Sequence, residues 1–388
     1  MSFTDSQQPL KRRREEDSIP SRLEALPNNI ILRSDIWYED GNVILQAKNT
    51  QFKVFRGILV ESSSVFRDMF SLPQPPSSDT QGLERCPIIH LADSAVDWRY
   101  VLQELCQRKH MRHSTQILLP VLSALLAIGQ KYDFHELYID AQNRVYRAIP
   151  ATLRQYDQVK NPEIVGFPND LAQWVALARR TGLLSILPWT YLSCCKAYTA
   201  DKIKNGLVEE GNKSKLSLHD QLTCLAGTLA IHAAQADTTY IWLHDVDTPL
   251  SSNCATIYLC TEIRRDVRVE KFPLAPDIMG FERWDSRFSN GLCKHCAAAA
   301  RTKHEAGRKQ LWNQLPGIFN LPPWSELLKE REEMHTQQVF HILSKHSAHL
   351  SPPTENEAII SKGPHLDSRI LGLAALWLNY TVKPLTLK

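Results

Sequence analysis

Residues 41–70 constrain the fold more than any other part of the chain, because the spacing of their apolar side chains changes midway. Between positions 43 and 54 apolar and polar residues alternate, which is the two-residue period of a half-buried strand. Asn49-Thr50 interrupts the alternation and predicts a turn between two strands. From Ile58 to Phe70 apolar residues recur every three or four positions, so this segment is predicted to form one helix that packs on the strands.

This pattern resembles the opening of a BTB/POZ domain. In that family a polar residue precedes an apolar strand, and a Phe-x-x-His-Arg/Lys motif leads into two apolar residues, a serine and an apolar-Phe pair. The positions that agree with the family are Phe52, Arg56, Ile58, Leu59, Ser63, Val65 and Phe66. Asn42 stands where the family usually has Asp, and Phe55 stands where it usually has His. Residues 34–40 resemble the lead-in of fungal members.

Later segments resemble the later elements of the same family, in the same order. Residues 87–91 are predicted to form a third strand, and residues 97–106 a helix with Trp98 on its apolar face. Residues 118–141 resemble the closing helix pair of the family, with Lys131-Tyr132 at the matching place. The resemblance covers roughly a third of the chain, which is about the ~120 residues expected of one small domain.

The resemblance implies an α+β fold in which an N-terminal BTB/POZ domain, a small sheet flanked by helices, is followed by an all-α domain. We expect a disordered tail over residues 1–30, the BTB/POZ domain over 31–150, the helical domain over 151–345, and a poorly ordered tail over 346–388. Within the first domain, the proline-rich and serine-rich residues 73–82 are predicted to form a loop.

Composition narrows the classes of partner. The 388 residues carry 45 basic and 42 acidic side chains, and this balance argues against a broad electrostatic nucleic-acid surface. The N-terminus lacks the apolar core of a secretory signal, and the apolar residues 370–378 are far fewer than the ~20 that span a bilayer. We therefore expect a soluble intracellular protein, cytoplasmic or nuclear, without a membrane partner or direct nucleic-acid binding.

The basic residues 11–14 allow two interpretations. Lys11-Arg12-Arg13-Arg14 could form a nuclear import signal. The acidic residues 15–17 follow directly, so the segment could equally be a solvated tail whose opposite charges neutralise each other.

Beyond residue 150 the apolar spacing is helical. Helices are predicted over residues 170–181, 183–197, 217–232 and 292–315, with Pro316 ending the last one. Pro323 is predicted at the first position of a further helix, and the charged, glycine-containing residues 201–215 are predicted to form a loop. Residues 178–192 resemble the region that follows the BTB domain in fungal proteins. The C-terminal region of these proteins is also similar to the Cys-x-x-Cys helix and the Pro-Pro-Trp that follows it.

Four of the nine cysteines form the best candidate for a metal site. Cys293 and Cys296 make a Cys-x-x-Cys pair, and Cys254 and Cys260 lie upstream in a stretch with little regular pattern. Four thiolates could close a tetrahedral structural zinc site, which would fix a loop at residues 261–292 to the long helix. The gap between Cys254 and Cys260 is wider than in common zinc pairs, and His295 and His304 are candidate substitutes for one ligand. The pair could instead be two small core residues, or a redox centre, although no thioredoxin-like pattern surrounds it.

No motif favours catalysis. The cluster His244-Asp245-x-Asp247 lies just before Pro249 and is better explained as a turn than as a catalytic or metal site. The serines at 62–64 lie within a predicted helix without the Gly-x-Ser-x-Gly pattern of a nucleophile elbow, so we interpret them as small packing residues. We expect no enzyme activity, no catalytic residue and no bound organic cofactor.

The resemblance implies a protein–protein interaction adaptor or scaffold whose BTB/POZ domain assembles with itself or with other proteins. In some members an acidic and a basic residue line a pocket in the dimer groove; here the acidic position is Asn42 and the basic one Arg56. Some members bind a cullin ubiquitin-ligase scaffold through an apolar-x-Glu motif, whereas this chain has Leu83-Glu84 without the intervening residue. The alternatives are a nuclear transcriptional co-regulator and a ubiquitin-ligase substrate adaptor.

Overall fold

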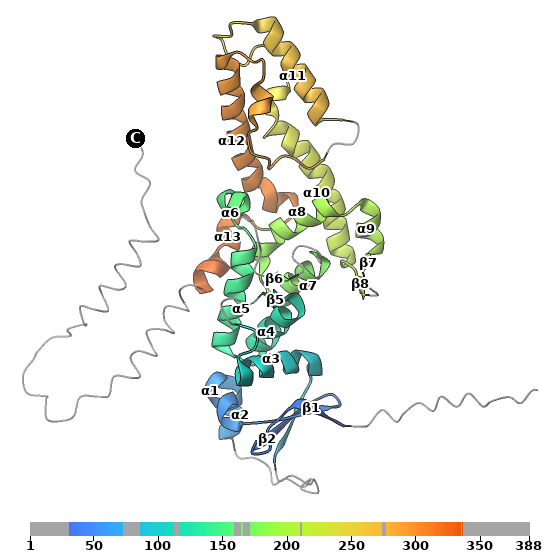
Figure 1. Ribbon diagram of the computed structural model, residues 1–388, viewed down its shortest axis with the longest axis vertical. Helices are drawn as coiled ribbons and strands as arrows, with labels where there is room; N and C mark the ends of the chain where they lie inside the picture. Colours follow the sequence, from blue (N-terminus) through green and yellow to red (C-terminus); the bar gives the residue numbers. More distant parts are fainter. Residues whose placement is uncertain are drawn as a thin grey trace, which may run out of the picture. The chain divides into compact units, whose positions relative to one another are not determined.

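A computed structural model describes residues 31–72, 86–111, 116–158, 164–165, 171–209, 212–273, 277–334 and 336. It has a small four-stranded sheet in its N-terminal part and a mostly helical remainder, so the α+β class is confirmed at that level (Figure 1). Residues up to Arg331 form one compact unit, and residues from Glu332 onward belong to a second. The predicted tails, the loop at 73–82 and Leu83-Glu84 lie outside the described residues.

The sheet has the order β1-β3-β2-β4, from strands β1 (Leu32–Trp37), β2 (Val43–Ala47), β3 (Thr50–Val54) and β4 (Ile88–Leu91). The predicted hairpin is confirmed, since β2 and β3 pair antiparallel with Val43 opposite Val54. Its turn lies one residue earlier than predicted, at Lys48-Asn49, because Lys48 takes the left-handed conformation with φ of 49°. The predicted third strand is β4, which pairs parallel with β2, and β1 forms the opposite edge beside β3.

The single helix predicted after the hairpin is wrong, because Ser63 divides it into α1 (Arg56–Ser62) and α2 (Ser64–Ser71). Ser63 is extended, with φ of −138° and ψ of 126°, and its Oγ accepts a hydrogen bond of 3.0 Å from the Phe66 amide. A serine in this position satisfies an amide that the first turn of a helix leaves unpaired. The Ser63 hydroxyl also donates to the Tyr132 carbonyl, so the cap ties α2 to a later helix.

Three longer helices complete this part of the core, and the first of them packs on β1 and β2 of the sheet. They are α3 (Ala95–Gln107), α4 (Leu119–Lys131) and α5 (His135–Ala148), close to their predicted bounds. Trp98 of α3 is fully buried, and its ring meets Phe66, Tyr132 and Phe134 with centroids 5.0–6.2 Å apart. This aromatic group joins the N-terminal helices to the pair α4–α5.

The remaining elements are mostly helical. They are α6 (Leu153–Gln158), β5 (Ile117–Leu118) paired with β6 (Ile164–Val165), α7 (Leu171–Thr181), η1 (Leu184–Ile186), α8 (Leu187–Ala197), α9 (Ala200–Asn205), the hairpin β7 (Leu207–Glu209) and β8 (Asn212–Ser214), α10 (Leu218–Asp237), η2 (Ile241–Leu243), α11 (Ile257–Lys271), η3 (Ser286–Ser289), α12 (Lys294–Ile318) and α13 (Trp324–Leu327).

Two predictions in this region are wrong. The loop predicted over residues 201–215 contains α9, which Thr199 caps, and the hairpin β7–β8. Pro316 does not end the long helix, because it lies inside α12 and the helix continues to Ile318. Proline cannot donate to the carbonyl four residues earlier, that of Trp312. The Trp324 indole donates to this oxygen instead, at 2.8 Å, and so replaces the missing hydrogen bond.

Apolar side chains form two separate cores. The larger core contains residues between Ile36 and Phe319, on both sides of position 150. The domain boundary predicted at this position therefore stays a prediction. Among the described residues, the smaller core has five buried members, Tyr240, Trp242, Leu243, Phe288 and Ala300. Helix α10 packs on α8 and α9 near its start and meets η2 near its end, so it connects the two cores (Figure 1).

Candidate metal centre

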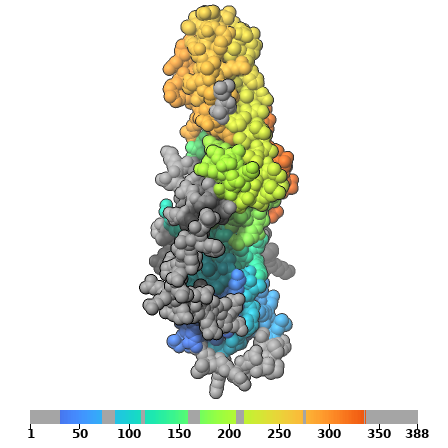
Figure 2. Space-filling view, turned by 90° about the vertical axis from the view of Figure 1, so that its right-hand side faces the viewer, coloured from blue at the N-terminus to red at the C-terminus, as the bar shows by residue number. Residues whose placement is uncertain are grey.

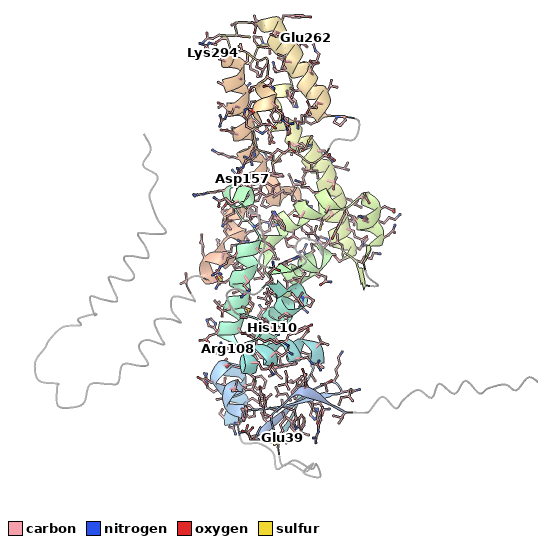
Figure 3. The ribbon with its side chains drawn as sticks, in the orientation of Figure 1. Glu39, Arg108, His110, Asp157, Glu262 and Lys294 are labelled. Atoms are coloured by element: carbon pink, nitrogen blue, oxygen red, sulfur yellow. The ribbon has the colours of Figure 1, made fainter. Side chains whose placement is uncertain are left out.

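The four predicted cysteine ligands come together at the N-terminal ends of two helices. Cys254 lies in the turn before α11 and Cys260 in the first turn of that helix. Cys293 is the N-cap of α12 and Cys296 lies in its first turn. Figure 3 labels Glu262, two residues after Cys260, and Lys294, directly after Cys293, and both lie at the same end of α11 and α12.

The structure corrects the surroundings predicted for Cys254 and Cys260. That stretch is not irregular, because Cys260 lies in the helix α11, which extends from Ile257 to Lys271. A metal would therefore join two helix ends instead of fixing a loop over residues 261–292.

Local hydrogen bonds hold both cysteine pairs in position. The Cys254 amide donates to the Ser251 carbonyl at 3.1 Å, which closes the turn before α11. Ahead of α12, Gly291 adopts a positive φ of 82°, which glycine tolerates readily, and the Leu292 amide donates to Ser289 at 3.0 Å. Cys293 is extended, as an N-cap residue should be, and its carbonyl accepts the first helical bond from Ala297 at 2.9 Å.

The distances between the sulfur atoms suit a metal ion. All four Sγ atoms lie within 4.8 Å of one another, and those of Cys254 and Cys293 are 3.8 Å apart. A tetrahedral zinc ion with bonds of about 2.3 Å places its sulfur ligands about 3.8 Å apart. A disulfide needs about 2.05 Å, so this pair has the separation of two metal ligands, and not of a disulfide.

Backbone amides surround the sulfur atoms. The Cys293 amide donates to the Cys260 sulfur at 3.3 Å, and the Thr256 hydroxyl lies 3.4 Å from the same atom. Interaction with the backbone amides of Cys296 and then Ala255 lowers the pKa of the Cys293 thiol, whereas burial raises the pKa of Cys296 to about 12. One thiol is thus prepared to lose its proton, and a bound cation would favour the thiolate at the others.

Arg264 places a positive charge beside the cluster. It lies one turn after Cys260 on α11 and is only 2% exposed. Its guanidinium donates to the carbonyl oxygens of Trp242, Thr248 and Asp245, which pins the segment before α11 to this helix. Zinc with four thiolates carries two negative charges, and a buried guanidinium nearby offsets part of this charge.

The sequence did not single out Arg264 as a residue beside the cysteine cluster, because its pattern offers only a weak indication of this position. A basic residue four positions after a candidate ligand on the same helix face would have been the only hint. The proposed substitute ligand His304 is not part of the cluster, since its ring is fully buried and its Nε2 lies 3.0 Å from the Glu282 carbonyl. His295 is not part of it either.

The other candidate clusters have structural explanations. Asp245 accepts hydrogen bonds from the Thr248 hydroxyl at 2.7 Å and the Asp247 amide at 3.3 Å, which is the turn that the sequence favoured. Asn42 accepts a hydrogen bond of 2.7 Å from the amide of Arg56, so it holds the start of α1.

Comparison with known proteins identifies no relative: no family model, curated protein or solved structure matches the chain. Among the described residues, no helix combines the length and apolar character needed to cross a membrane.

Proposed function

We propose that the chain is a protein–protein interaction adaptor that acts through a BTB/POZ domain at residues 31–150 and has no catalytic role. The support is the order of its elements, in which a strand hairpin, two short helices, a parallel strand and three longer helices follow one another. This is the order in which the sequence resembles the family. Self-association is part of the proposal, since members of that family assemble with themselves or with other proteins.

The observation that carries an interaction role is a row of leucines on α10, which we call the α10 leucine face. Leu218, Leu222 and Leu229 are 71%, 59% and 74% exposed, and Leu225 between them is half-buried. Their spacing of four, three and four residues is that of the contact positions in a coiled coil. Scattered exposed leucines are ordinary, but a row with this spacing marks a surface where another helix packs.

The charge distribution on α10 supports the same conclusion. Apart from His219 and His232, the ionisable acidic and basic residues of this 20-residue helix are Asp220, which is buried, and Asp237 at its end. An exposed helix face normally carries charged side chains, and their absence removes the main penalty for covering it. The yellow-green residues of α10 reach the surface in Figure 2.

The edges of the sheet offer a further place for docking. Strands β1 and β4 form the two edges of the sheet, and the apolar side chains of Leu32 and Ile88 on them are 59% and 45% exposed. A strand edge can pair with the backbone of a partner.

Affinity purification of the full chain tests the proposal. We expect Leu222→Glu/Leu229→Glu to lose a set of partners that the wild type and a control, Val269→Glu, both retain. Val269 is 70% exposed on α11 and lies outside the α10 leucine face, so it controls for the added charge. Identical partner sets for all three chains would remove the role of α10, and recovery of no specific partner by the wild type would refute the adaptor function.

We also propose that Cys254, Cys260, Cys293 and Cys296 hold a structural zinc ion. The support is the fit of the sulfur spacing to a tetrahedral ion and the small size of the adjoining core. A core of five buried residues provides little hydrophobic stabilisation, and small folds of this kind commonly depend on a metal or on disulfides.

A further inference from the structure

A cleft rich in positive charge lies between α6, the segment that leads to η3, and α12. It encloses about 480 Å³, and its basic lining residues are Arg154, Arg283, Arg301, Arg308 and Lys309. Asp157, labelled in Figure 3 where α6 lies beside α12, and Glu305 are the acidic residues in the lining. We call this site the basic cleft.

Three distant parts of the chain supply these cations. Arg154 comes from α6, Arg283 from the segment before η3, and the other three from α12. Positions 301, 308 and 309 are seven and eight residues apart, so they lie on one side of the helix.

Two of the arginines form hydrogen bonds with Asp157. Arg308 is only 7% exposed; its Nη2 donates to Asp157 Oδ1 at 2.6 Å, and it also donates to the Phe281 carbonyl at 2.9 Å. Arg283, whose side chain is 66% exposed, donates to the backbone carbonyl of Asp157 at 2.8 Å. The buried Arg308 therefore holds α6 against α12, while Arg283 is open to a ligand.

The carboxylates that line the basic cleft do not neutralise all of its cations. Five cations face two carboxylates, an excess of three positive charges that equals the net charge of +3 of the whole chain. The Asp157 carboxylate is engaged by Arg308, and Glu305 pairs with Arg301 at 2.8 Å. Like charges gathered around one cleft repel each other, and a multiply charged anion would relieve that repulsion.

A second, aromatic compartment adjoins the basic cleft. It encloses about 430 Å³, shares Asp157 and Arg283 with the basic cleft, and is otherwise lined by Tyr156, Trp189, Phe281 and the acidic Glu282. Trp189 and Phe281 are only 8% and 2% exposed, so neither ring offers an open face for base stacking. The lack of an open stacking face argues against a single-stranded nucleic acid as the ligand.

We propose that the basic cleft binds a phosphorylated segment of a partner protein, an inference that rests on the proposed adaptor function. The phosphate dianion lies among Arg154, Arg283 and Lys309, where it accepts charge-assisted hydrogen bonds. The residue beside the phosphorylated one packs on Tyr156, the half-buried ring of the aromatic compartment. Clusters of arginine are a recurring means of recognising phosphorylated motifs.

Peptide binding to the full chain tests this inference. The probe is a degenerate peptide library with a central phosphoserine and apolar neighbours, measured by fluorescence polarisation beside the same library with serine. We expect binding of the phosphorylated library only. Arg154→Gln/Lys309→Gln should weaken it at least about tenfold, because two charged contacts are lost. Lys303→Gln is the matched control, since Lys303 is an exposed cation of α12 outside the lining, and it should change binding less than about twofold.

Three outcomes would overturn the inference. They are equal binding of the serine library, an equal loss in Lys303→Gln, and binding of a single-stranded oligonucleotide in place of the phosphopeptides. These results are separate from the test of the adaptor function. If the α10 leucine face still captures partners while no phosphopeptide binds, the adaptor proposal stands and the phosphate site is refuted.

Discussion

Cys293 has a structural role at the start of α12 and a proposed role as a metal ligand. Its extended backbone begins α12, and its amide donates to the Cys260 sulfur at 3.3 Å. Its own sulfur lies 3.8 Å from that of Cys254, so the residue connects the two cysteine pairs. A serine could take over the N-cap function but not the metal ligation, which separates the two functions experimentally.

Cys293→Ser should therefore lose zinc, while α12 should still begin at Lys294. We expect the purified wild type to contain about one equivalent of zinc and the variant well below half of that, with unfolding easier by at least about 2 kcal/mol. Elemental analysis and thermal unfolding measure both quantities. Cys86→Ser is the control, because Cys86 is a half-buried thiol outside the cluster. Equal zinc in Cys293→Ser, or none in the wild type, would contradict the metal site.

His304 makes the stability of the smaller core depend on pH. Its ring lies between Tyr240, Trp284 and Phe288, and burial lowers its pKa below the ordinary 6.5. Arg308 acts in the same direction, while Glu282 and Glu305 oppose it. As the pH falls through 6.5, the unfolded chain gains a proton at this position that the folded chain does not, so the folded state becomes less stable.

His304→Phe should remove this contribution. Between about pH 7.5 and 5.5, we expect the free energy of unfolding to fall less steeply for the variant than for the wild type. Denaturant unfolding at a series of pH values measures the slope. His219→Gln, which replaces an exposed histidine of α10 outside the smaller core, is the control for the loss of a histidine. A steeper or unchanged slope in His304→Phe would show that the buried ring is not responsible.

Among the helices, the crossing of α12 with the end of α10 depends on one small residue. A Cβ atom added at Gly307 would lie 2.2 Å from the Thr238 carbonyl oxygen, which is far inside van der Waals contact. This oxygen belongs to the backbone and cannot move aside as a flexible side chain would. The close approach positions α12 against the segment that carries Tyr240 and Trp242 of the smaller core.

Gly307→Ala should consequently destabilise the protein by about 1–3 kcal/mol through overpacking. Gly317→Ala on the same helix is the control, because nothing lies within 4 Å of its added Cβ. Its stability should stay the same or rise by up to ~1 kcal/mol, since alanine favours helix more than glycine does. Chemical denaturation of both variants checks the pair, and equal stabilities would argue against a tight crossing.

Element predictions succeeded where the information was local and failed where a distant partner intervened. The strands β2 and β3 and the helices α3, α4 and α7 follow from apolar periodicity within each segment. Ser63, however, separates α1 from α2 within one periodic segment. Helix α12 also continues past Pro316, where a proline was expected to end it. The second exception depends on Trp324, whose indole replaces the missing donor. Periodicity within one segment carries no information about such a contact.

For the whole molecule, the two cores predict two levels of stability. The larger core joins the sheet to most of the helices, while the smaller core includes Ala300 of α12, the helix that begins at the cysteine cluster. Removing the proposed zinc ion should therefore loosen the smaller core and leave the larger one intact.

Hydrogen exchange before and after chelation measures this difference. We expect amides of α11 and of the first turns of α12 to lose protection when zinc is removed, while those of β2, β3 and α4 stay protected. Cys293→Ser without chelator should reproduce the same pattern. Uniform loss of protection along the chain would mean that the two cores unfold together, and no change would mean that the cluster does not stabilise the smaller core.

The periods of two and of three to four residues, the turn residues and the helix caps were enough to predict the α+β class and most helices, because these signals act within a few residues of one another. They also singled out the four cysteines, since the choice of thiol ligands is a matter of residue type. Long-range packing brings Cys254 and Cys260 to Cys293 and Cys296, buries Arg264 beside them, and gathers Arg154 and Arg283 against α12. These sites depend on which helix faces meet, and that choice is made by the burial of apolar area and the pairing of buried polar groups over the whole chain.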